Sequence, residues 1–176
     1  PSLTVDGAHL VYSSTRAGNA DIWYRSLPGG QDRAITVSPK HEVWPIISPD
    51  AIRAIYGVSS QADGLVLDRL GSIFTSAIAG GVPEAGCSDC RRPESWSKDG
   101  RYQLFLWGNA GRNAVGLLEP ASGKKVDLIQ HQEHPISSPR LSPDDRWIAF
   151  YEYTSPQSRR IWSAPFKGSV PIPQSE

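Results

Sequence analysis

The sequence predicts an all-β protein built from a repeated unit, and three observations support this fold class. A Ser or Thr followed two positions later by Asp occurs four times, with the Asp residues at positions 6, 50, 99 and 144. Each of these pairs precedes two short runs rich in β-branched and aromatic residues, which strands prefer. No stretch of the sequence both lacks Gly and Pro and has its apolar residues at helical spacing.

Each element of the unit has a local reason. The first is extended, as in Pro45–Ile47, and leads into a turn at Ser48–Asp50, because Pro presets φ and Asp tolerates turn conformations. The second strands are Leu10–Tyr12, Ala54–Tyr56, Leu104–Leu106 and Ile148–Phe150, and the third are Asp21–Tyr24, Ser72–Phe74, Ala114–Leu118 and Arg160–Trp162. Turns of small residues follow at positions 29–30, 80–81, 122–123 and 167–168, and fourth strands are expected near Arg33–Val37, Val126–Ile129 and Ser169–Ile172.

Four-stranded units repeated in tandem at this period predict the blades of a β-propeller. The blades are expected at about residues 1–40, 41–86, 87–131 and 132–176. Propellers close with about four to eight blades, so we expect an arc that is part of a larger ring, or a ring completed by a second copy. The alternative is a closed ring of four blades. Open blade edges would favour a homodimer.

Composition excludes several classes of function. The chain has 176 residues, 18 basic and 18 acidic side chains and a formal net charge of zero, which argues against nucleic acid as a partner. The longest uninterrupted apolar run, Trp147–Tyr151, is far too short for membrane insertion. The stretch Gly108–Gly111 lacks the Lys and the Ser or Thr that follow the glycines of a phosphate loop. We expect no cofactor. Because the chain opens on Pro1, we expect it to be a piece of a longer protein.

Two segments resemble a known repeat. Val5–Gly7 with Ser13–Trp23, and again Ser142–Phe150, are similar to the TolB-like β-propeller repeat, which reads SPDG, an apolar strand, SxRxGxxxIW and a Gly-Gly turn. Ala51 and Asp145 replace the turn Gly, and Gly57–Leu70 is longer than the pattern allows, so the second blade fits least well. The resemblance implies a propeller and, from the family alone, an extracytoplasmic (periplasmic) location.

A second likeness is to the propeller regions attached to bacterial serine/threonine kinases or DNA-binding regulators. It rests on Cys87–Pro93 before the third repeat and on Ala164–Phe166 with Ile172–Glu176 at the end. This resemblance implies a sensor or scaffold region joined to another domain.

The loops that precede the Ser/Thr-x-Asp turns should lie on one face of a propeller, at the mouth of its channel. They carry candidate binding residues for a protein or peptide partner or a small ligand, namely His41, Trp44, Arg91, Arg92, Glu94, His134 and Arg140. The alternative for the charged members is a solvated rim. Trp23, Phe74 and Trp162 share one repeat position and are expected to pack between blades, and Trp96 is expected in the core.

A zinc site formed by Cys87, Cys90, His131 and His134 has suitable ligand types, but the two pairs come from different blades. A disulfide between the two cysteines is a second alternative. Two reduced loop thiols are the alternative that the sequence favours.

Catalysis has little support in the sequence, which predicts that the chain is not an enzyme. The G-x-S-x-G nucleophile elbow does not occur, and Asp144-Asp145 lies in a blade turn, where Asp accepts backbone hydrogen bonds. The leading hypothesis is a non-catalytic scaffold for protein interaction or ligand sensing. The alternative is the accessory, gating propeller of a prolyl-oligopeptidase-like serine peptidase whose catalytic domain lies elsewhere. A carbohydrate-active propeller would need more channel carboxylates than Glu42, Glu94 and Glu133.

Overall fold

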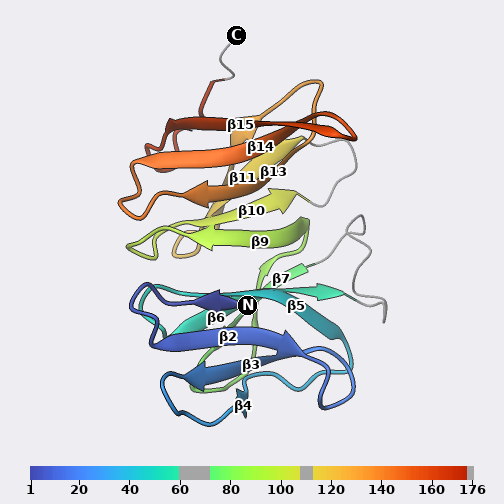
Figure 1. Ribbon diagram of the computed structural model, residues 1–176, viewed down its shortest axis with the longest axis vertical. Helices are drawn as coiled ribbons and strands as arrows, with labels where there is room; N and C mark the ends of the chain where they lie inside the picture. The colour runs from blue at the N-terminus through green and yellow to red at the C-terminus, as the bar shows by residue number, and fades with distance from the viewer. Residues whose placement is uncertain (60–71, 108–112, 174–176) are drawn as a thin grey trace. The chain divides into compact units, whose positions relative to one another are not determined.

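The computed structural model describes residues 1–59, 72–107 and 113–173, and all of its regular structure there is β-strand. Among these residues no helix is long and apolar enough to cross a membrane. The strands form four antiparallel sheets in two compact units, Pro1–Pro93 and Glu94–Glu176 (Figure 1). The sheets correspond to the four sequence repeats, so the predicted all-β class and blade architecture are confirmed.

The first unit holds two blades in which sequential strands are neighbours. Most of Gly57–Leu70, the insertion in the second repeat, lies outside the described residues. The first blade comprises β1 (Ser2–Leu3), β2 (His9–Ser14), β3 (Asp21–Ser26) and β4 (Arg33–Ala34), and the second comprises β5 (His41–Ile47), β6 (Arg53–Ser59), β7 (Ser72–Ala77) and β8 (Glu84–Cys87).

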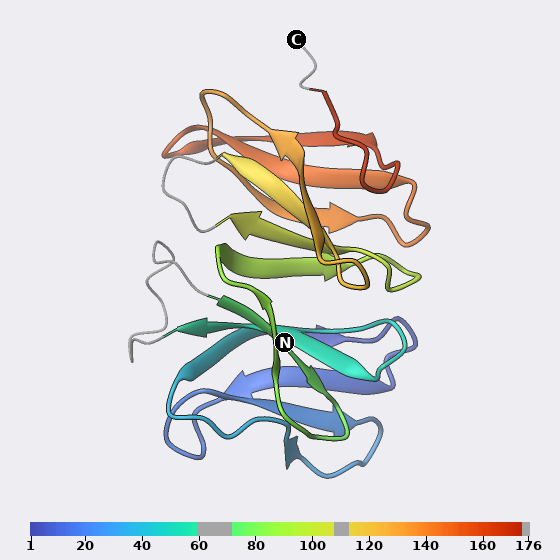
Figure 2. The same ribbon diagram turned by 180° about the vertical axis from the view of Figure 1, so that it is seen from behind.

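The second unit holds most of the third blade and all of the fourth (Figure 2). The third blade comprises β9 (Cys90–Trp96), β10 (Gln103–Trp107), β11 (Ala114–Glu119) and β12 (Lys124–Gln130), and the fourth comprises β13 (Ile136–Leu141), β14 (Trp147–Ser155) and β15 (Ser158–Pro165).

The Ser/Thr-x-Asp turn has the same hydrogen bonds in every blade, which explains why it repeats. In the third blade the Ser97 hydroxyl donates to Asp99 Oδ1 at 2.7 Å and accepts the Tyr102 N–H at 2.9 Å. Asp99 Oδ1 also accepts the Arg101 N–H at 3.0 Å. Corresponding bonds occur at Thr4 and Asp6, at Ser48 and Asp50, and at Ser142 and Asp144.

The residue after the turn Asp adopts a positive φ in all four blades. Gly7 and Gly100 have φ values of 70° and 71°, where glycine carries no steric penalty. Ala51 and Asp145 reach 56° and 55° in the same place, so the two departures from the repeat keep its backbone conformation. The turn hydrogen bonds therefore hold these residues in a region that L side chains rarely occupy.

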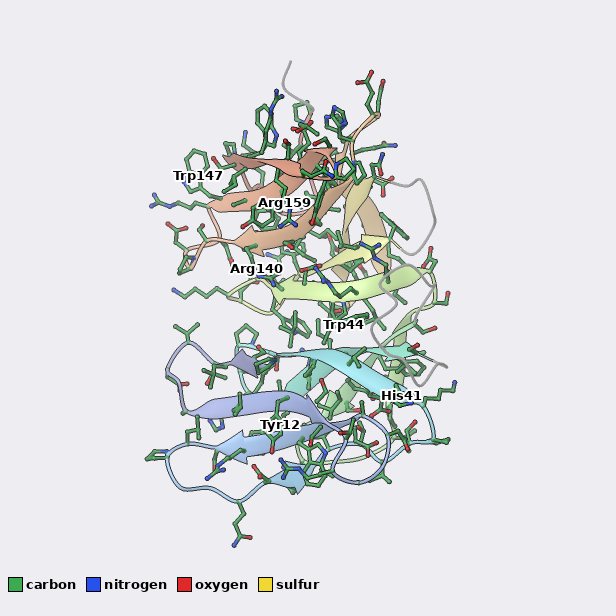
Figure 3. The ribbon with its side chains drawn as sticks, turned by 45° about the vertical axis from the view of Figure 1, so that its right-hand side comes forward. Tyr12, His41, Trp44, Arg140, Trp147 and Arg159 are labelled. Atoms are coloured by element: carbon green, nitrogen blue, oxygen red, sulfur yellow. A yellow bond between two sulfur atoms is a disulfide. The ribbon has the colours of Figure 1, made fainter. Side chains whose placement is uncertain are left out.

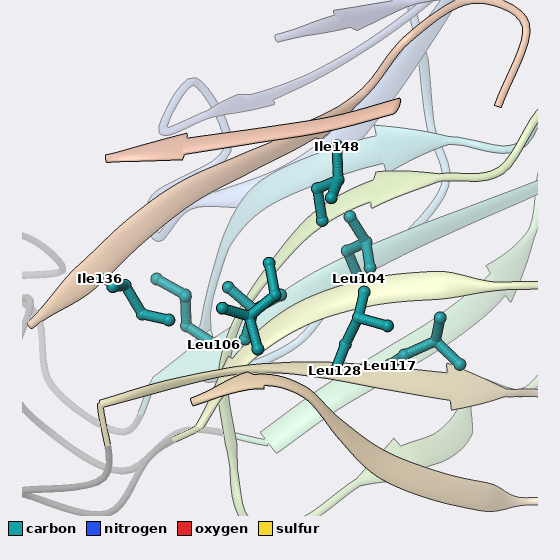
Figure 4. Packing of buried hydrophobic residues seen from close by; sticks show 8 residues of the cluster. Leu104, Leu106, Leu117, Leu128, Ile136 and Ile148 are labelled. Atoms are coloured by element: carbon teal, nitrogen blue, oxygen red, sulfur yellow. The ribbon is translucent and has the colours of Figure 1, made fainter. Parts of the chain in front are cut away.

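Each unit has its own apolar core between its two blades. In the first unit Val11 and Ile22 of the first blade pack with Ile47, Ala54 and Tyr56 of the second. In the second unit the core joins the third and fourth blades (Figure 4), and its buried members are Leu104, Leu106, Val115, Leu117, Leu128, Ile129, Ile136 and Ile148. Full burial of each such side chain contributes about 1.5–3 kcal/mol.

The aromatic positions follow the repeat only in part. Phe74 packs against the core of the first unit, and Trp96 is 8% exposed, as expected for core positions. Trp23 is instead half-buried beneath the Arg16 guanidinium, 4.4 Å from its ring centroid. Trp162 is 36% exposed and donates through Nε1 to a carboxylate, that of Glu152, at 2.5 Å.

The fourth blade departs from the expected pattern at its last strand. Ser169–Ile172 was expected to pair with β15, but the Ile172 N–H donates to Leu128 O at 2.7 Å and Ile172 forms a parallel bridge with Ile129 of β12. Pro171 and Pro173 flank Ile172 and lack the N–H donors that a regular ladder needs. The Ile172 side chain packs against the core of the second unit, which favours the observed position.

Candidate functional site

Two predicted site residues, His41 and Trp44, lie on strand β5 (Figure 3). Trp44 was expected in a loop on the binding face of the propeller. It is instead half-buried at a β-bulge with φ 54°, and its ring covers Gly57, where an added Cβ would lie 3.1 Å from Trp44 Cε3. The bulge turns the indole onto the neighbouring strand β6, so part of the Trp44 side chain has a packing role.

A buried polar network surrounds Glu42, which lies between His41 and Trp44 in β5. Glu42 is 3% exposed and accepts a hydrogen bond from the Thr36 hydroxyl, which itself accepts the Ile22 N–H at 2.9 Å. Burial raises the pKa of Glu42, and the nearby charge of Asp21 acts in the same direction. These contacts join the first and second blades, so the network has a structural role.

Cys87 and Cys90 form a disulfide, with their Cα atoms 5.5 Å apart. The sequence favoured two reduced thiols, and that expectation is wrong. The short link between β8 and β9 brings both cysteines together in a buried place, where they are 4% and 0% exposed. Since the disulfide leaves no thiolate, the zinc site with His131 and His134 loses both of its sulfur ligands. Arg91 and Arg92 follow in β9 and are half-buried.

Glu94 and Arg140 are brought together by the inner strands of the third and fourth blades, β9 and β13. Arg140 Nη1 donates to Glu94 Oε2 at 2.7 Å, to Glu94 O at 2.8 Å and to Pro139 O at 2.9 Å. The Glu94 side chain is 1% exposed, whereas that of Arg140 is 59% exposed. Thus Glu94 is not part of a solvated rim: its buried carboxylate anchors an arginine whose side chain is largely exposed.

The sequence did not identify Glu152, which lies at the centre of a polar cluster in the second unit. Glu152 is 3% exposed, and its Oε1 lies 3.3 Å from His131 Nε2 and 3.8 Å from His134 Nε2. Its Oε2 accepts the Trp162 N–H described above. The sequence did hold a sign of it, because the corresponding positions of the second and third repeats are the apolar Val58 and Trp107.

The hydrogen bonds of His131 determine what this cluster can do. Its Nδ1 accepts the N–H groups of Glu133 at 3.2 Å and His134 at 2.9 Å, so the ring proton belongs on Nε2, facing Glu152. Both ring nitrogens are therefore occupied, and His131 has no free nitrogen with which to take a proton from a substrate. The cluster orders the loop before β13 and leaves the half-buried His134 ring partly accessible.

Solved structures similar to this chain decide the type of propeller. No protein-family model matches the sequence, and no curated protein matches it. The chain is similar to TolB from Acinetobacter baumannii, with 17% identity and a TM-score of 0.76, and to a putative TolB from Agrobacterium tumefaciens, with 22% identity and a TM-score of 0.75. The fold is that of a TolB-like β-propeller.

This TolB-like propeller covers only part of its structural neighbours. The alignments include 97% and 99% of the chain but 41% and 61% of the two TolB chains. The chain is also similar to a structure from a study of two prolyl endopeptidases, with 13% identity and a TM-score of 0.65, over 93% of this chain and 27% of that one. These likenesses establish the fold.

Proposed function

We propose that this TolB-like propeller is a non-catalytic scaffold that captures a protein or peptide partner through a carboxylate bound by Arg140. The proposal rests on the hydrogen bonding of Arg140. Its Nη1 is held by three oxygens, and within the described ranges no hydrogen bond reaches its Nε or Nη2. Arg is enriched among the residues that dominate binding energy at interfaces, because its planar donors match carboxylate geometry.

The contact with Glu94 prepares Arg140 for binding. A side chain that is already fixed in the free protein loses less conformational entropy when a partner arrives. The buried Glu94 carboxylate restrains Nη1 while the rest of the guanidinium remains accessible, with the side chain 59% exposed. His134, at the start of the same blade, is a second candidate contact, and His41, Trp44, Arg91 and Arg92 are candidate contacts of the first unit.

The occupied nitrogens of His131 support a binding role over a catalytic one. A second candidate function is the accessory propeller of a serine peptidase, which the likeness to the prolyl endopeptidase structure favours. The domain encoded beside this chain separates the two candidates. An α/β-hydrolase domain downstream would favour the peptidase, and a kinase or DNA-binding domain upstream would favour the scaffold.

A peptide array tests the proposal. The labelled chain should be retained on peptides that carry accessible carboxylates, and Arg140→Lys should bind them roughly tenfold more weakly, because lysine keeps the charge beside Glu94 but lacks the planar fork. Arg159→Lys is the matched control, since Arg159 lies over the Tyr153 ring at 4.9 Å, away from Glu94. Equal binding by both variants, or no retained peptide, would contradict the proposal.

A further inference from the structure

Strand β15 differs from the equivalent strands of the other blades in what pairs with it. In the first three blades the third strand carries an antiparallel fourth strand, in the pairs β3 with β4, β7 with β8 and β11 with β12. β15 is the third strand of its blade and pairs with β14 on one side. Within the described part of the chain, no strand pairs with its other edge. An unpaired strand edge is a template for another strand.

A groove lies beside β15. One wall is formed by Trp162–Pro165 of β15 and the other by Val170–Pro173, and we call the space between them the β15 groove. It combines two adjoining cavities of about 70 Å³ and about 370 Å³, which share lining residues on both walls. Phe150 and Ile129 contribute apolar surface at the smaller cavity, so the groove can take an apolar side chain.

Basic side chains lie toward both ends of the β15 groove. Lys167 lines the larger cavity and is exposed. Arg160 is exposed and pairs with Glu152 across the two strands, which places it on the same face of the sheet as Trp162. Glu152 is itself 3% exposed and already accepts N–H groups, so it does not present its charge to the groove.

We propose that the β15 groove binds an extended peptide of a partner protein, which adds an antiparallel fourth strand to the last blade. An apolar side chain of the peptide enters between Trp162 and Ile172, and acidic side chains lie beside Arg160 and Lys167. Backbone hydrogen bonds to β15 provide affinity, and the apolar pocket with its basic ends provides selectivity. The other blades supply the precedent for the occupant, since an extended antiparallel strand covers the same edge in each. The site is separate from Arg140 and goes beyond the proposed function.

Fluorescence anisotropy tests this site with a short labelled peptide in which valine alternates with glutamate. Saturable binding is expected. A version with lysine in place of glutamate, and a version N-methylated at every second residue, should each bind at least about tenfold more weakly, because they lose the charge match or the edge hydrogen bonds. Absence of binding, or equal binding of the N-methylated peptide, would overturn strand addition.

Protein variants locate the binding. Arg160→Glu and Lys167→Glu change exposed side chains and should each weaken binding about five- to tenfold. Arg159→Glu is the matched control, because Arg159 is the neighbour of Arg160 on the opposite face of β15, and it should bind as the unmodified chain does. Arg140→Lys should also leave this binding unchanged, so failure here is distinct from failure at Arg140.

A second copy of the chain is the competing occupant of the groove. Light scattering on the unmodified chain and on Lys167→Glu distinguishes it from a partner peptide. A monomer in both cases supports the peptide, whereas a dimer that Lys167→Glu dissociates would assign the groove to self-association and overturn the proposal.

Discussion

Replacement of Arg140 by alanine should destabilise the protein because the buried Glu94 carboxylate loses this guanidinium partner. Removing one partner of a buried ion pair costs about 3–5 kcal/mol. The Arg140 end is 59% exposed and Glu94 is 1% exposed, so solvent weakens the attraction and lowers this figure. Water can also replace part of the hydrogen bonding that Arg140 gives to the carbonyl oxygens of Glu94 and Pro139. We therefore expect Arg140→Ala to lower the free energy of unfolding by about 2–3 kcal/mol, a fall in Tm of roughly 4–12 °C for a chain of this length.

A double-mutant cycle separates the ion pair from general damage. Urea unfolding at neutral pH, followed by circular dichroism, would compare the unmodified chain with Arg140→Ala, Glu94→Gln and the double variant. A buried amide costs less than a buried carboxylate, so Glu94→Gln should restore about 1–2 kcal/mol in the Arg140→Ala background. Arg159→Ala removes another exposed arginine and should change stability by less than about 0.5 kcal/mol.

Two results would refute this reasoning. One is a loss below about 0.5 kcal/mol for Arg140→Ala, which would mean that the buried carboxylate does not hold the guanidinium. The other is strict additivity of the two substitutions, since residues in direct contact at 2.7 Å should be coupled.

Four further predictions concern the turns, the buried network and the packing. Ser97→Ala removes two hydrogen bonds made by a buried hydroxyl and should cost about 1.5–3 kcal/mol in urea unfolding. The turn hydrogen bonds lower the folded-state pKa of Asp99, so stability present above about pH 4 should be lost as pH falls further, and Asp99→Asn should lose less over that range. Burial raises the pKa of Glu42, so the free energy of unfolding should decline as pH rises through the folded-state pKa, and Glu42→Gln should remove that slope across a pH series of urea titrations. Gly116→Ala would place a Cβ 2.2 Å from the Phe105 ring and should lower Tm through a loss of about 1–3 kcal/mol, a prediction that an unchanged Tm would contradict.

The repeated parts of the fold could be predicted because their causes are local. The Ser97 hydroxyl and the Asp99 carboxylate bond to backbone groups within five residues of them, so a short pattern carries the whole turn. Strand composition is equally local, and the period of the turns then gives the blades.

The site was less predictable because its geometry depends on pairing between distant segments. Arg140 and Glu94 were both identified as candidates, but their direct contact spans 46 positions of sequence. Glu152 was missed because a single charged residue in an apolar run does not reveal that two histidines will face it. The position of Trp44 depends on a bulge, and a bulge shifts the register without a distinct composition.

The last strand of the fourth blade shows a competition that sequence periodicity cannot resolve. The repeat favoured pairing of Ser169–Ile172 with β15, while the two flanking prolines and the burial of Ile172 favoured β12. Local pattern and tertiary packing disagree there, and packing determines the structure.

The most direct test of the proposed scaffold role is an NMR titration that observes arginine side chains. The isotope-labelled chain would be titrated with a carboxylate-bearing peptide selected on the array, and the Nε–Hε resonance of each arginine would be followed. If Arg140 binds the carboxylate, its resonance should shift saturably while that of Arg159 stays in place. An unmoved Arg140 resonance, with saturable shifts elsewhere on the chain, would contradict this binding.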